Sequence, residues 1–235
     1  MNRSTGPSPA FSPALRPLLF DFDGTLIDSR EDLASAVNAL LRELGLNPLP
    51  LDQVLGYVGR GARTLVSRSL EAADPDGRIP QDDSTRLRFL AHYSSVLLGH
   101  TRPYEGVING LDTLLGASVP MALVTNKPME PTRAILAGLG MERYFSVVMA
   151  GDSLPERKPH PLPLWAAADA LGVARSRCLM VGDSDVDAEA ASAAGMDFVW
   201  CPWGGIRWER PVGTTRVAAD FAAVVAMGMA ATSNQ

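Results

Sequence analysis

The stretch Pro17-Leu18-Leu19-Phe20-Asp21-Phe22-Asp23-Gly24-Thr25-Leu26 decides the fold. Its apolar run, residues 17–20, is typical of a buried strand in a parallel sheet. Asp21 and Asp23 follow at the tip of this strand, and Gly24 permits a sharp turn. Two carboxylates at a strand tip lose water and repel each other unless a cation or a proton offsets their charge. The stretch therefore indicates a divalent metal and acid–base chemistry, with a turn carrying two solvated aspartates as the alternative.

The charge and the apolar content of the chain exclude several classes of partner. The 235 residues have a net charge of −5, so neither a nucleic acid nor an acidic membrane surface is expected to bind. No apolar stretch approaches the roughly 18–20 residues of a membrane-spanning helix. We therefore expect a cytoplasmic protein that acts on a small molecule, and the sequence leaves its oligomeric state open.

The first residues and the two cysteines bear on the cellular compartment. The chain through Pro17 has four prolines and no apolar run, which is unlike a secretory signal and favours a disordered tail over residues 1–16. Its arginines and hydroxyls, without an acid, make a transit peptide the alternative. Cys178 and Cys201 lie in apolar runs and are expected to be core residues in a reducing compartment.

Short apolar runs alternate with helical patterns along most of the chain. This alternation predicts an α/β fold with a Rossmann-like parallel sheet. The predicted strands are Leu18–Phe20, Met121–Val124, Ser146–Met149, Cys178–Val181 and Phe198–Cys201. The predicted core helices are Val107–Leu115, Glu130–Leu139, Leu162–Leu171 and Val186–Ala194.

The first crossover connection is far longer than a parallel pair of strands requires. The segment in between shows apolar residues at helical spacing, first over Glu31–Leu44 and then over Val54–Val58, Arg63–Glu71 and Ser84–Leu98. We therefore predict a helical cap over residues 29–102, inserted into a catalytic core of residues 17–28 and 103–230. An insertion directly after the two aspartates can cover them as a lid.

Three further polar motifs follow the later strands. In an open parallel sheet, ligands bind beyond the carboxyl ends of the strands, so these motifs are expected on one rim with the two aspartates. They are Thr125-Asn126-Lys127, Lys158-Pro159-His160-Pro161 and Gly182-Asp183-Ser184-Asp185-Val186-Asp187.

The chemistry of this rim suits a metal and a phosphoryl group. Asp21, Asp23 and Asp183 supply the hard oxygen ligands that Mg²⁺ prefers. The hydroxyl of Thr125 and the ammonium of Lys158 suit phosphoryl oxygens.

Lysine occurs only twice in the chain, and both lysines lie in these motifs. This position favours a functional role for Lys158 over a solvated surface one. Lys127 can equally well just precede a helix that starts at Pro128. Residues 183–187 have a simpler alternative too, as an acidic helix N-terminus.

The four motifs in order resemble those of the haloacid-dehalogenase-like hydrolases. The matching stretches are Asp-Phe-Asp-Gly-Thr-Leu-x-Asp-Ser, Thr-Asn-Lys-Pro, Arg-Lys-Pro-His-Pro and Val-Gly-Asp-Ser-x-x-Asp, between Asp21 and Asp187. The resemblance implies a Rossmann-like core with a helical cap. It implies that Asp21 is the nucleophile that forms an aspartyl phosphate, and that Asp23 protonates the leaving oxygen and later activates water.

The resemblance also implies roles for the other motifs. Thr125 and Lys158 would hold the phosphoryl oxygens, and Asn126 is a further candidate for substrate binding. Asp183 would complete the Mg²⁺ site, with Asp187 as a nearby support. These roles are consistent with the chemistry, because a carboxylate can attack a phosphate dianion only where positive charge masks the repulsion.

Within this family, three segments resemble bacterial phosphoglycolate phosphatases, which implies 2-phosphoglycolate as the substrate. They are Tyr57–Ala62, Arg102–Val107 and Gly151–Pro161. Arg60 stands where a neutral residue is expected, which leaves the preferred substrate open. We predict that Arg60 and Arg63 donate to the substrate's carboxylate, and solvated arginines at a helix start are the alternative.

Other functions remain open or are disfavoured. A phosphatase for N-acetylmuramate 6-phosphate or a sugar phosphate, or a phosphosugar mutase, uses the same residues. A phosphonate hydrolase needs a cap lysine, which residues 29–102 lack. A dehalogenase does not need Asp23, and a dinucleotide-binding module needs Gly-x-Gly-x-x-Gly after the first strand. The loop Trp203–Trp208 is expected either to edge the site or to pack on the core.

Overall fold

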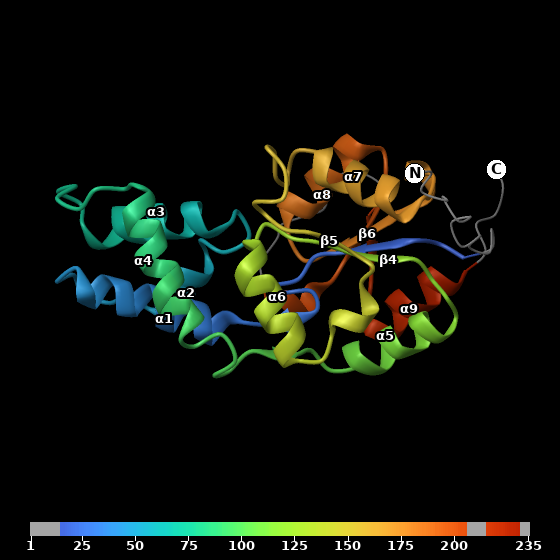
Figure 1. Ribbon diagram of the computed structural model, residues 1–235, viewed down its shortest axis with the longest axis horizontal. Helices are drawn as coiled ribbons and strands as arrows, with labels where there is room; N and C mark the ends of the chain where they lie inside the picture. Colours follow the sequence, from blue (N-terminus) through green and yellow to red (C-terminus); the bar gives the residue numbers. More distant parts are fainter. Residues whose placement is uncertain (1–14, 206–214, 231–235) are drawn as a thin grey trace, which may run out of the picture.

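The computed structural model describes residues 15–205 and 215–230, whose main sheet has six strands (Figure 1). The order is β5-β4-β1-β6-β7-β8, and all neighbouring strands are parallel. The α/β class with a Rossmann-like parallel sheet is thus confirmed. The five predicted strands are all present, with ends that differ by at most one residue. The strands are β1 (Leu18–Phe20), β4 (Met121–Val124), β5 (Val147–Met149), β6 (Leu179–Gly182), β7 (Asp197–Trp200) and β8 (Thr215–Val217).

Helices cover both faces of the sheet (Figure 1). Successive strand residues point to opposite faces, so Leu19 packs in the core under α7 and α8, while Leu18 and Phe20 pack in the core with α5 and α9. The strands are apolar on both faces for this reason. The core helices are α5 (Val107–Gly116), α6 (Met129–Gly138), α7 (Leu162–Leu171), α8 (Asp185–Ala194) and α9 (Phe221–Met229).

The predicted insertion, residues 29–102, contains four helices at one end of the molecule (left in Figure 1). A short antiparallel ribbon, β2 (Ile27–Asp28) with β3 (Arg102–Pro103), joins it to the core. The apolar stripe of the first helix is buried against the last, where Phe89 and Tyr93 stack. The cap helices are α1 (Arg30–Glu43), α2 (Leu51–Leu55), α3 (Ala62–Ala73) and α4 (Asp83–Ser94).

The predicted disordered tail needs a correction at its end. Residues 1–14 lie outside the described residues, but Leu15 packs on the core and Arg16 is buried. The Arg16 guanidinium donates to Asp197 Oδ2 at 2.5 Å. An ion pair from the sheet therefore orders the chain before the predicted start of the core.

Two elements near the C-terminus were missed by the sequence analysis, β8 and α9. Helix α9 is apolar on most sides, so it lacks the amphipathic period that marks a surface helix. It packs closely on α5 and β1, since a Cβ on Gly228 would lie 2.8 Å from a methyl carbon of Leu18. In the cap, α2 begins at Leu51 rather than Val54, and α4 ends at Ser94 rather than Leu98.

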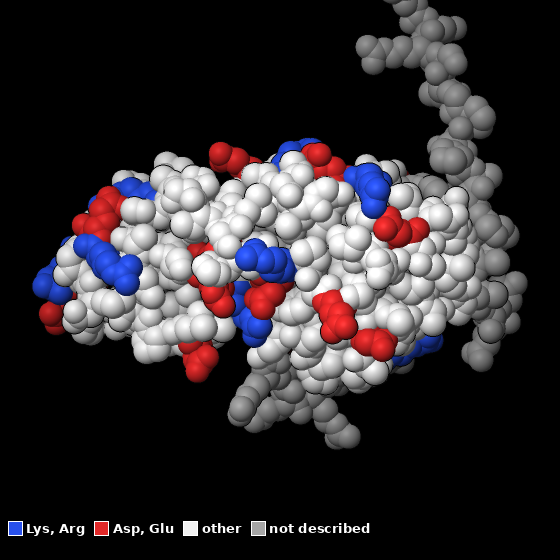
Figure 2. All heavy atoms as spheres, turned by 90° about the horizontal axis from the view of Figure 1, so that it is seen from below, with Lys and Arg blue, Asp and Glu red and all other residues white. Residues whose placement is uncertain are grey.

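No helix in the described part of the chain combines the length and apolar character that crossing a bilayer requires. On the face seen in Figure 2, the acidic and basic side chains of the described residues are interspersed, and neither sign forms a continuous patch. Both cysteines are buried and free.

Candidate active site

The carboxyl ends of three adjacent strands bring the predicted motifs together. Asp21 follows β1, Thr125 follows β4 and Asp183 follows β6, and β4, β1 and β6 are neighbours. Lys158 arrives from the loop between β5 and α7, and Asp187 from the first turn of α8. All five residues are buried. The structure thus gathers residues from four separate parts of the chain at one rim of the sheet.

Lys158 is the cation at the centre of this rim. Its Nζ donates to Asp21 Oδ1 at 2.8 Å and to Asp187 Oδ1 at 2.7 Å, and its side chain is only 2% exposed. Burial opposes the positive charge, but the carboxylates of Asp187 and Asp21 outweigh it and raise the pKa of Lys158 above its usual value. The side chain is therefore a fixed ammonium at neutral pH.

Three carboxylates converge beside this single ammonium. Ligand oxygens of Asp21, Asp183 and Asp187 lie within 4.8 Å of one another. Burial, and then the charge of Asp187, raise the pKa of Asp21 to about 7. Burial and the charge of Asp21 raise the pKa of Asp183 well above its usual value. The cluster holds more negative charge than Lys158 can balance, so a further cation would stabilise it.

A divalent cation fits beside Asp21 and Asp183. Asp183 Oδ2 is buried and has no hydrogen-bond partner among the described residues. A Cβ on Gly24 or Gly204 would lie 2.1 or 2.3 Å from this oxygen, so both glycines keep the space beside it open. Asp187, by contrast, uses both oxygens within the protein, one on Lys158 and the other on Ser184 N and Oγ at 3.2 and 2.6 Å. Asp187 therefore holds Lys158 in place.

The side chain of Asp23 does not join the carboxylate cluster. Its two oxygens accept from Lys127 Nζ at 2.7 and 2.8 Å, and Oδ1 also accepts from Ser29 Oγ at 2.5 Å. The prediction that the Asp23 carboxylate shares the metal with Asp21 and Asp183 therefore needs correction. The chain leaves β1 after Phe20 and makes the predicted turn at Gly24, which has φ +84°, and the Asp23 side chain pairs with Lys127.

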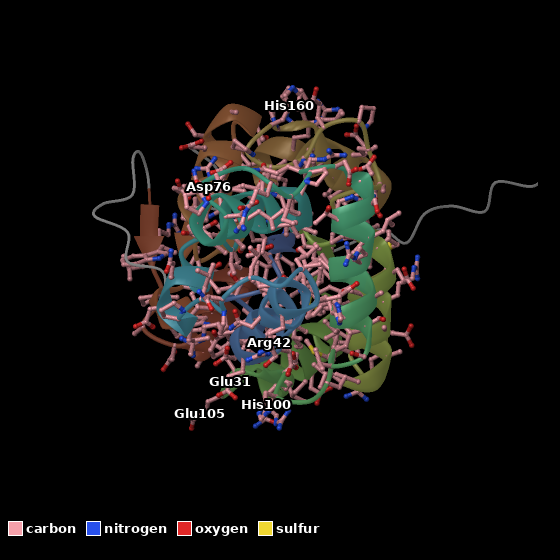
Figure 3. The ribbon with its side chains drawn as sticks, turned by 90° about the vertical axis from the view of Figure 1, so that its left-hand side faces the viewer. Glu31, Arg42, Asp76, His100, Glu105 and His160 are labelled. Carbon is pink, nitrogen blue, oxygen red and sulfur yellow. The ribbon has the colours of Figure 1, made fainter. Side chains whose placement is uncertain are left out.

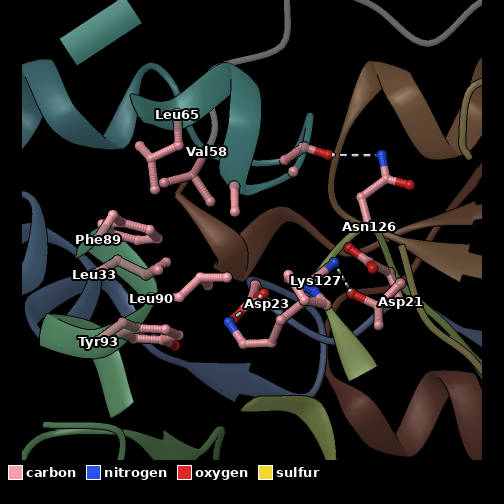
Figure 4. A pocket seen from close by; sticks show the side chains of 15 residues that line it. Asp21, Asp23, Leu33, Val58, Leu65, Phe89, Leu90, Tyr93, Asn126 and Lys127 are labelled. Carbon is pink, nitrogen blue, oxygen red and sulfur yellow. Dashed lines mark hydrogen bonds and ion pairs between the residues drawn. The ribbon is translucent and has the colours of Figure 1, made fainter. Parts of the chain in front are cut away.

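Sequence reasoning left Lys127 undecided, and the structure places it in the site. Its Nζ contacts Asp23 and lies 4.8 Å from the ring centre of Tyr93 on α4 (Figure 4). Burial opposes its charge, but Asp23 and Tyr93 raise its pKa above the usual value. The presence of only two lysines in the chain was the signal that could have identified it.

Asn126 connects the cap to the loop between β5 and α7. Its Nδ2 donates to the Gly59 carbonyl at 3.0 Å and to the Lys158 carbonyl at 2.8 Å. The structure therefore gives Asn126 a positioning role between cap and core. Thr125 Oγ1 accepts from Lys127 N at 3.2 Å and keeps its own proton for another acceptor.

The two cap arginines pair with carboxylates other than Asp21, Asp23 and Asp183. Arg60 pairs with Asp185 at 2.9 Å, with both side chains 44% exposed. Arg63 pairs with Asp83 within the cap at 2.6 Å and is 56% exposed. Contacts of Arg60 and Arg63 with the substrate therefore stay a prediction. Arg60 bridges cap and core and lines a groove that Asp23 and Asp183 also line.

The remaining polar candidates are structural. His160 is exposed at the edge of the molecule (Figure 3), and its Nδ1 accepts from Leu162 N at 3.2 Å at the start of α7. Trp203 Nε1 donates to the Thr25 carbonyl at 3.0 Å, which ties its loop to the turn after β1. Residues 206–208 of the predicted aromatic loop lie outside the described residues.

Two hollows adjoin the catalytic carboxylates. A cavity of about 40 Å³ lies under the cap between Asp23, Lys127 and apolar cap side chains (Figure 4). A groove of about 810 Å³ runs between cap and core past Asp183 and Arg60. A substrate entering by the groove can therefore place one end at Asp21 and the other under the cap.

In metal-free protein, the free energy of unfolding is expected to fall as the pH rises from about 4 to about 7. The pKa of Asp21 moves from 3.8 to about 7 on folding. Over this interval the unfolded chain loses the Asp21 proton while the folded chain keeps it, so rising pH favours unfolding. Denaturant titrations in EDTA at both ends of the interval measure the loss. The Asp21→Asn variant has no titrating group at this position, so its free energy of unfolding should fall less over the interval. Equal falls in the two proteins would contradict the raised pKa of Asp21.

Comparison with known proteins identifies the family to which this chain belongs. The model of the haloacid dehalogenase-like hydrolase family matches residues 18–201, and the chain belongs to this family. A phosphoglycolate phosphatase of Colwellia psychrerythraea is 40% identical over 192 residues, which cover 80% of this chain and 84% of the relative. One of Neisseria gonorrhoeae is 42% identical over 183 residues, 77% of each chain. The chain is accordingly a phosphatase, a hydrolase of phosphoric monoesters.

Solved structures show the same architecture. The crystal structure of a predicted phosphoglycolate phosphatase from Haemophilus somnus superposes with a TM-score of 0.84, at 30% identity over 91% of this chain and 97% of the other. CbbY from Rhodobacter sphaeroides, solved with phosphate, superposes with a TM-score of 0.77 at 22% identity over 88% and 95% of the two chains. At 22% identity, the likeness to CbbY shows a shared fold alone.

Proposed function

We propose that this phosphatase hydrolyses 2-phosphoglycolate to glycolate and phosphate, with Mg²⁺, through an aspartyl phosphate on Asp21. The observation that carries the mechanism is the position of Asp21, buried between the Lys158 ammonium and the unsatisfied Asp183 oxygen. The relatives named phosphoglycolate phosphatase support the substrate. We expect a small-molecule reaction in the cytoplasm, without a nucleic acid or membrane partner.

Two displacements at phosphorus account for the reaction. An Asp21 oxygen attacks phosphorus while the bond to the glycolate oxygen breaks, and Asp23 gives its proton to that oxygen. Asp23 then takes a proton from water, which attacks the aspartyl phosphate and restores Asp21. Lys158 and Thr125 donate to the phosphoryl oxygens throughout. Mg²⁺, held by Asp21 and Asp183, would supply positive charge that offsets the phosphate and the carboxylates.

A panel of small phosphate esters tests the substrate. We expect 2-phosphoglycolate to have the highest kcat/KM in a panel that includes sugar phosphates, N-acetylmuramate 6-phosphate, ethyl phosphate and an aryl phosphate. A sugar phosphate is the second candidate, because the groove of about 810 Å³ exceeds the needs of a two-carbon acid. A sugar phosphate that leads by about tenfold, some 1.4 kcal/mol in transition-state binding, would favour that candidate.

Removal of Mg²⁺ by EDTA is expected to abolish activity on every ester, and added Mg²⁺ to restore it. Ca²⁺ should inhibit, because its looser and higher coordination disturbs the in-line geometry. Asp183→Asn should raise the Mg²⁺ concentration for half-maximal activity by more than about tenfold, since even losses outside the ligand shell cost ~10–100-fold.

A binding measurement separates metal affinity from turnover. Mg²⁺ should raise the melting temperature of the unmodified protein, because a ligand that binds the folded state stabilises it. The same concentration of Mg²⁺ should raise the melting temperature of the Asp183→Asn variant much less. Full activity in stripped protein, or an undiminished thermal shift in Asp183→Asn, would contradict the metal site.

A further inference from the structure

The site holds a second buried ammonium that the steps above leave without a task toward substrate. Lys127 follows β4, and its side chain is 4% exposed. Its described contacts are the two oxygens of Asp23 and the face of the Tyr93 ring. An ammonium carries three donors, so Lys127 can hold Asp23 and still donate to a further acceptor.

Tyr93 brings a second unused polar group to the same place. Tyr93 is only 2% exposed, and its buried hydroxyl lies beside Lys127 without a hydrogen bond of normal geometry to any described residue. A buried hydroxyl without a partner is costly unless a ligand satisfies it. Tyr93 lies on α4 of the cap, and Figure 4 shows its hydroxyl end directed toward Lys127 of the core.

The cavity between these two residues is small and otherwise largely apolar. Its volume is about 40 Å³, room for little more than a few water-sized groups. Leu33, Val58, Leu65 and Phe89 form its wall on the cap side (Figure 4). These side chains cannot solvate a charge, so an anion would depend on Lys127 and Tyr93.

We propose that Lys127 and Tyr93 bind the carboxylate of the substrate in this cavity and so select phosphorylated two-carbon acids. The inference rests on the proposed function and names the residues that recognise the acid. One methylene separates the phosphoester oxygen of phosphoglycolate from its carboxylate. Asp21 and Asp23 line the same cavity, so a phosphoryl group at Asp21 leaves the carboxylate next to Lys127.

Charge and size both fit this assignment. The Lys127 ammonium is buried beside the cavity and has three donors, so it can hold Asp23 and also receive the substrate carboxylate. The Tyr93 hydroxyl, which lines the same cavity, can supply a hydrogen bond to the carboxylate. A sugar ring would not fit the cavity, so the acid end of a two-carbon substrate is the group selected there.

Selectivity between two matched esters tests the assignment. Ethyl phosphate replaces the carboxylate of phosphoglycolate by a methyl group and keeps the rest. The ratio of kcat/KM for phosphoglycolate to that for ethyl phosphate should fall about tenfold in Tyr93→Phe and ~10–100-fold in Lys127→Met, as expected for lost hydrogen bonds to a charged group. Tyr144→Phe is the control, because its hydroxyl contacts Asp112 outside the site, and it should keep the ratio.

A binding measurement gives a readout independent of turnover. In the Asp21→Asn background, calorimetry should show the dissociation constant of 2-phosphoglycolate rising about tenfold on adding Tyr93→Phe, with a smaller change for ethyl phosphate. Tyr93→Phe changes one atom and keeps the contact of Lys127 with Asp23, so it remains informative if Lys127→Met does not fold.

The outcomes separate this inference from the proposed function. Unmodified protein that does not prefer phosphoglycolate over ethyl phosphate would overturn the proposed substrate, and this assignment with it. The carboxylate site alone would be overturned if the unmodified protein prefers phosphoglycolate and the Lys127 and Tyr93 variants keep both the kcat/KM ratio and the affinity for 2-phosphoglycolate. Loss of the ratio in both variants, and not in Tyr144→Phe, supports it.

Discussion

Asp21→Asn is expected to lower kcat by roughly 10⁴-fold or more on every phosphate ester, because an amide cannot attack phosphorus. The fold should persist, since the amide is nearly isosteric and Lys158 keeps its 2.7 Å contact with Asp187. Stability in metal-free buffer at neutral pH should rise by on the order of 1 kcal/mol, because the variant removes a buried carboxylate whose burial disfavours its charge. Steady-state kinetics and thermal melts measure both effects.

A matched variant and a trapping experiment check the Asp21 result. Asp76→Asn makes the same chemical change at an exposed position of the cap (Figure 3) and should alter neither activity nor stability. Fluoroberyllate mimics a phosphoryl group on a carboxylate, so it should bind the unmodified protein and not Asp21→Asn. More than a trace of residual activity in Asp21→Asn would show that another residue is the nucleophile.

Lys158→Met is expected to reduce both activity and stability. Loss of the ammonium leaves Asp21 and Asp187 buried without a counter-charge, a change that typically costs about 3–5 kcal/mol. For a chain of this size the melting temperature should fall by roughly 6–20 °C. Loss of a donor to the transferring phosphoryl group should lower kcat by about 10²–10³-fold. Denaturant titration and kinetics on folded protein at low temperature separate the two effects.

Two controls distinguish the buried pair from ordinary surface charge. Arg175→Met breaks an exposed pair with Asp169 and should cost at most about 1 kcal/mol. Adding Asp187→Asn to Lys158→Met removes one unpaired charge, so it should recover part of the stability and none of the activity. Unchanged stability in Lys158→Met would mean that the buried ion pairs do not form.

The buried carboxylates that the proposed reaction requires lower the stability of the folded protein. Buried carboxylates at Asp21 and Asp183 have pKa values above the usual range, so in metal-free protein the cluster opposes folding at neutral pH. The same concentration of negative charge favours a cation at the position where a phosphate must be received. Stabilising substitutions are therefore expected to cluster at these catalytic residues and to remove activity.

Part of the site could be predicted because parallel strands end on one rim. Apolar runs marked β1, β4 and β6, and the residues after them, Asp21, Thr125 and Asp183, had to meet once the strands paired in parallel. Lys158 was recognisable as one of only two lysines in a chain rich in arginine. These predictions required only local patterns and the geometry of the sheet.

Other residues depended on contacts between distant segments. The turn after β1 directs Asp23 away from the cluster and toward Lys127, which is 104 positions further along the chain. Tyr93 meets Lys127 only because the cap packs over the core. Arg60 and Arg63 are close in sequence to Gly59 and Gly61. In the structure they form ion pairs with Asp185 and Asp83.

The sequence by itself determined the class of fold, the helical insertion and the placing of Asp21, Thr125 and Asp183 on one rim, because these follow from periodicity and strand polarity. Only the tertiary structure decided which carboxylates share a cation, which ammonium faces the cavity and which cap residues line it. Those choices depend on side-chain hydrogen bonds and burial between segments far apart in the chain. No local pattern encodes the free energy of such contacts, because each partner's environment exists only after the cap and the core have folded together.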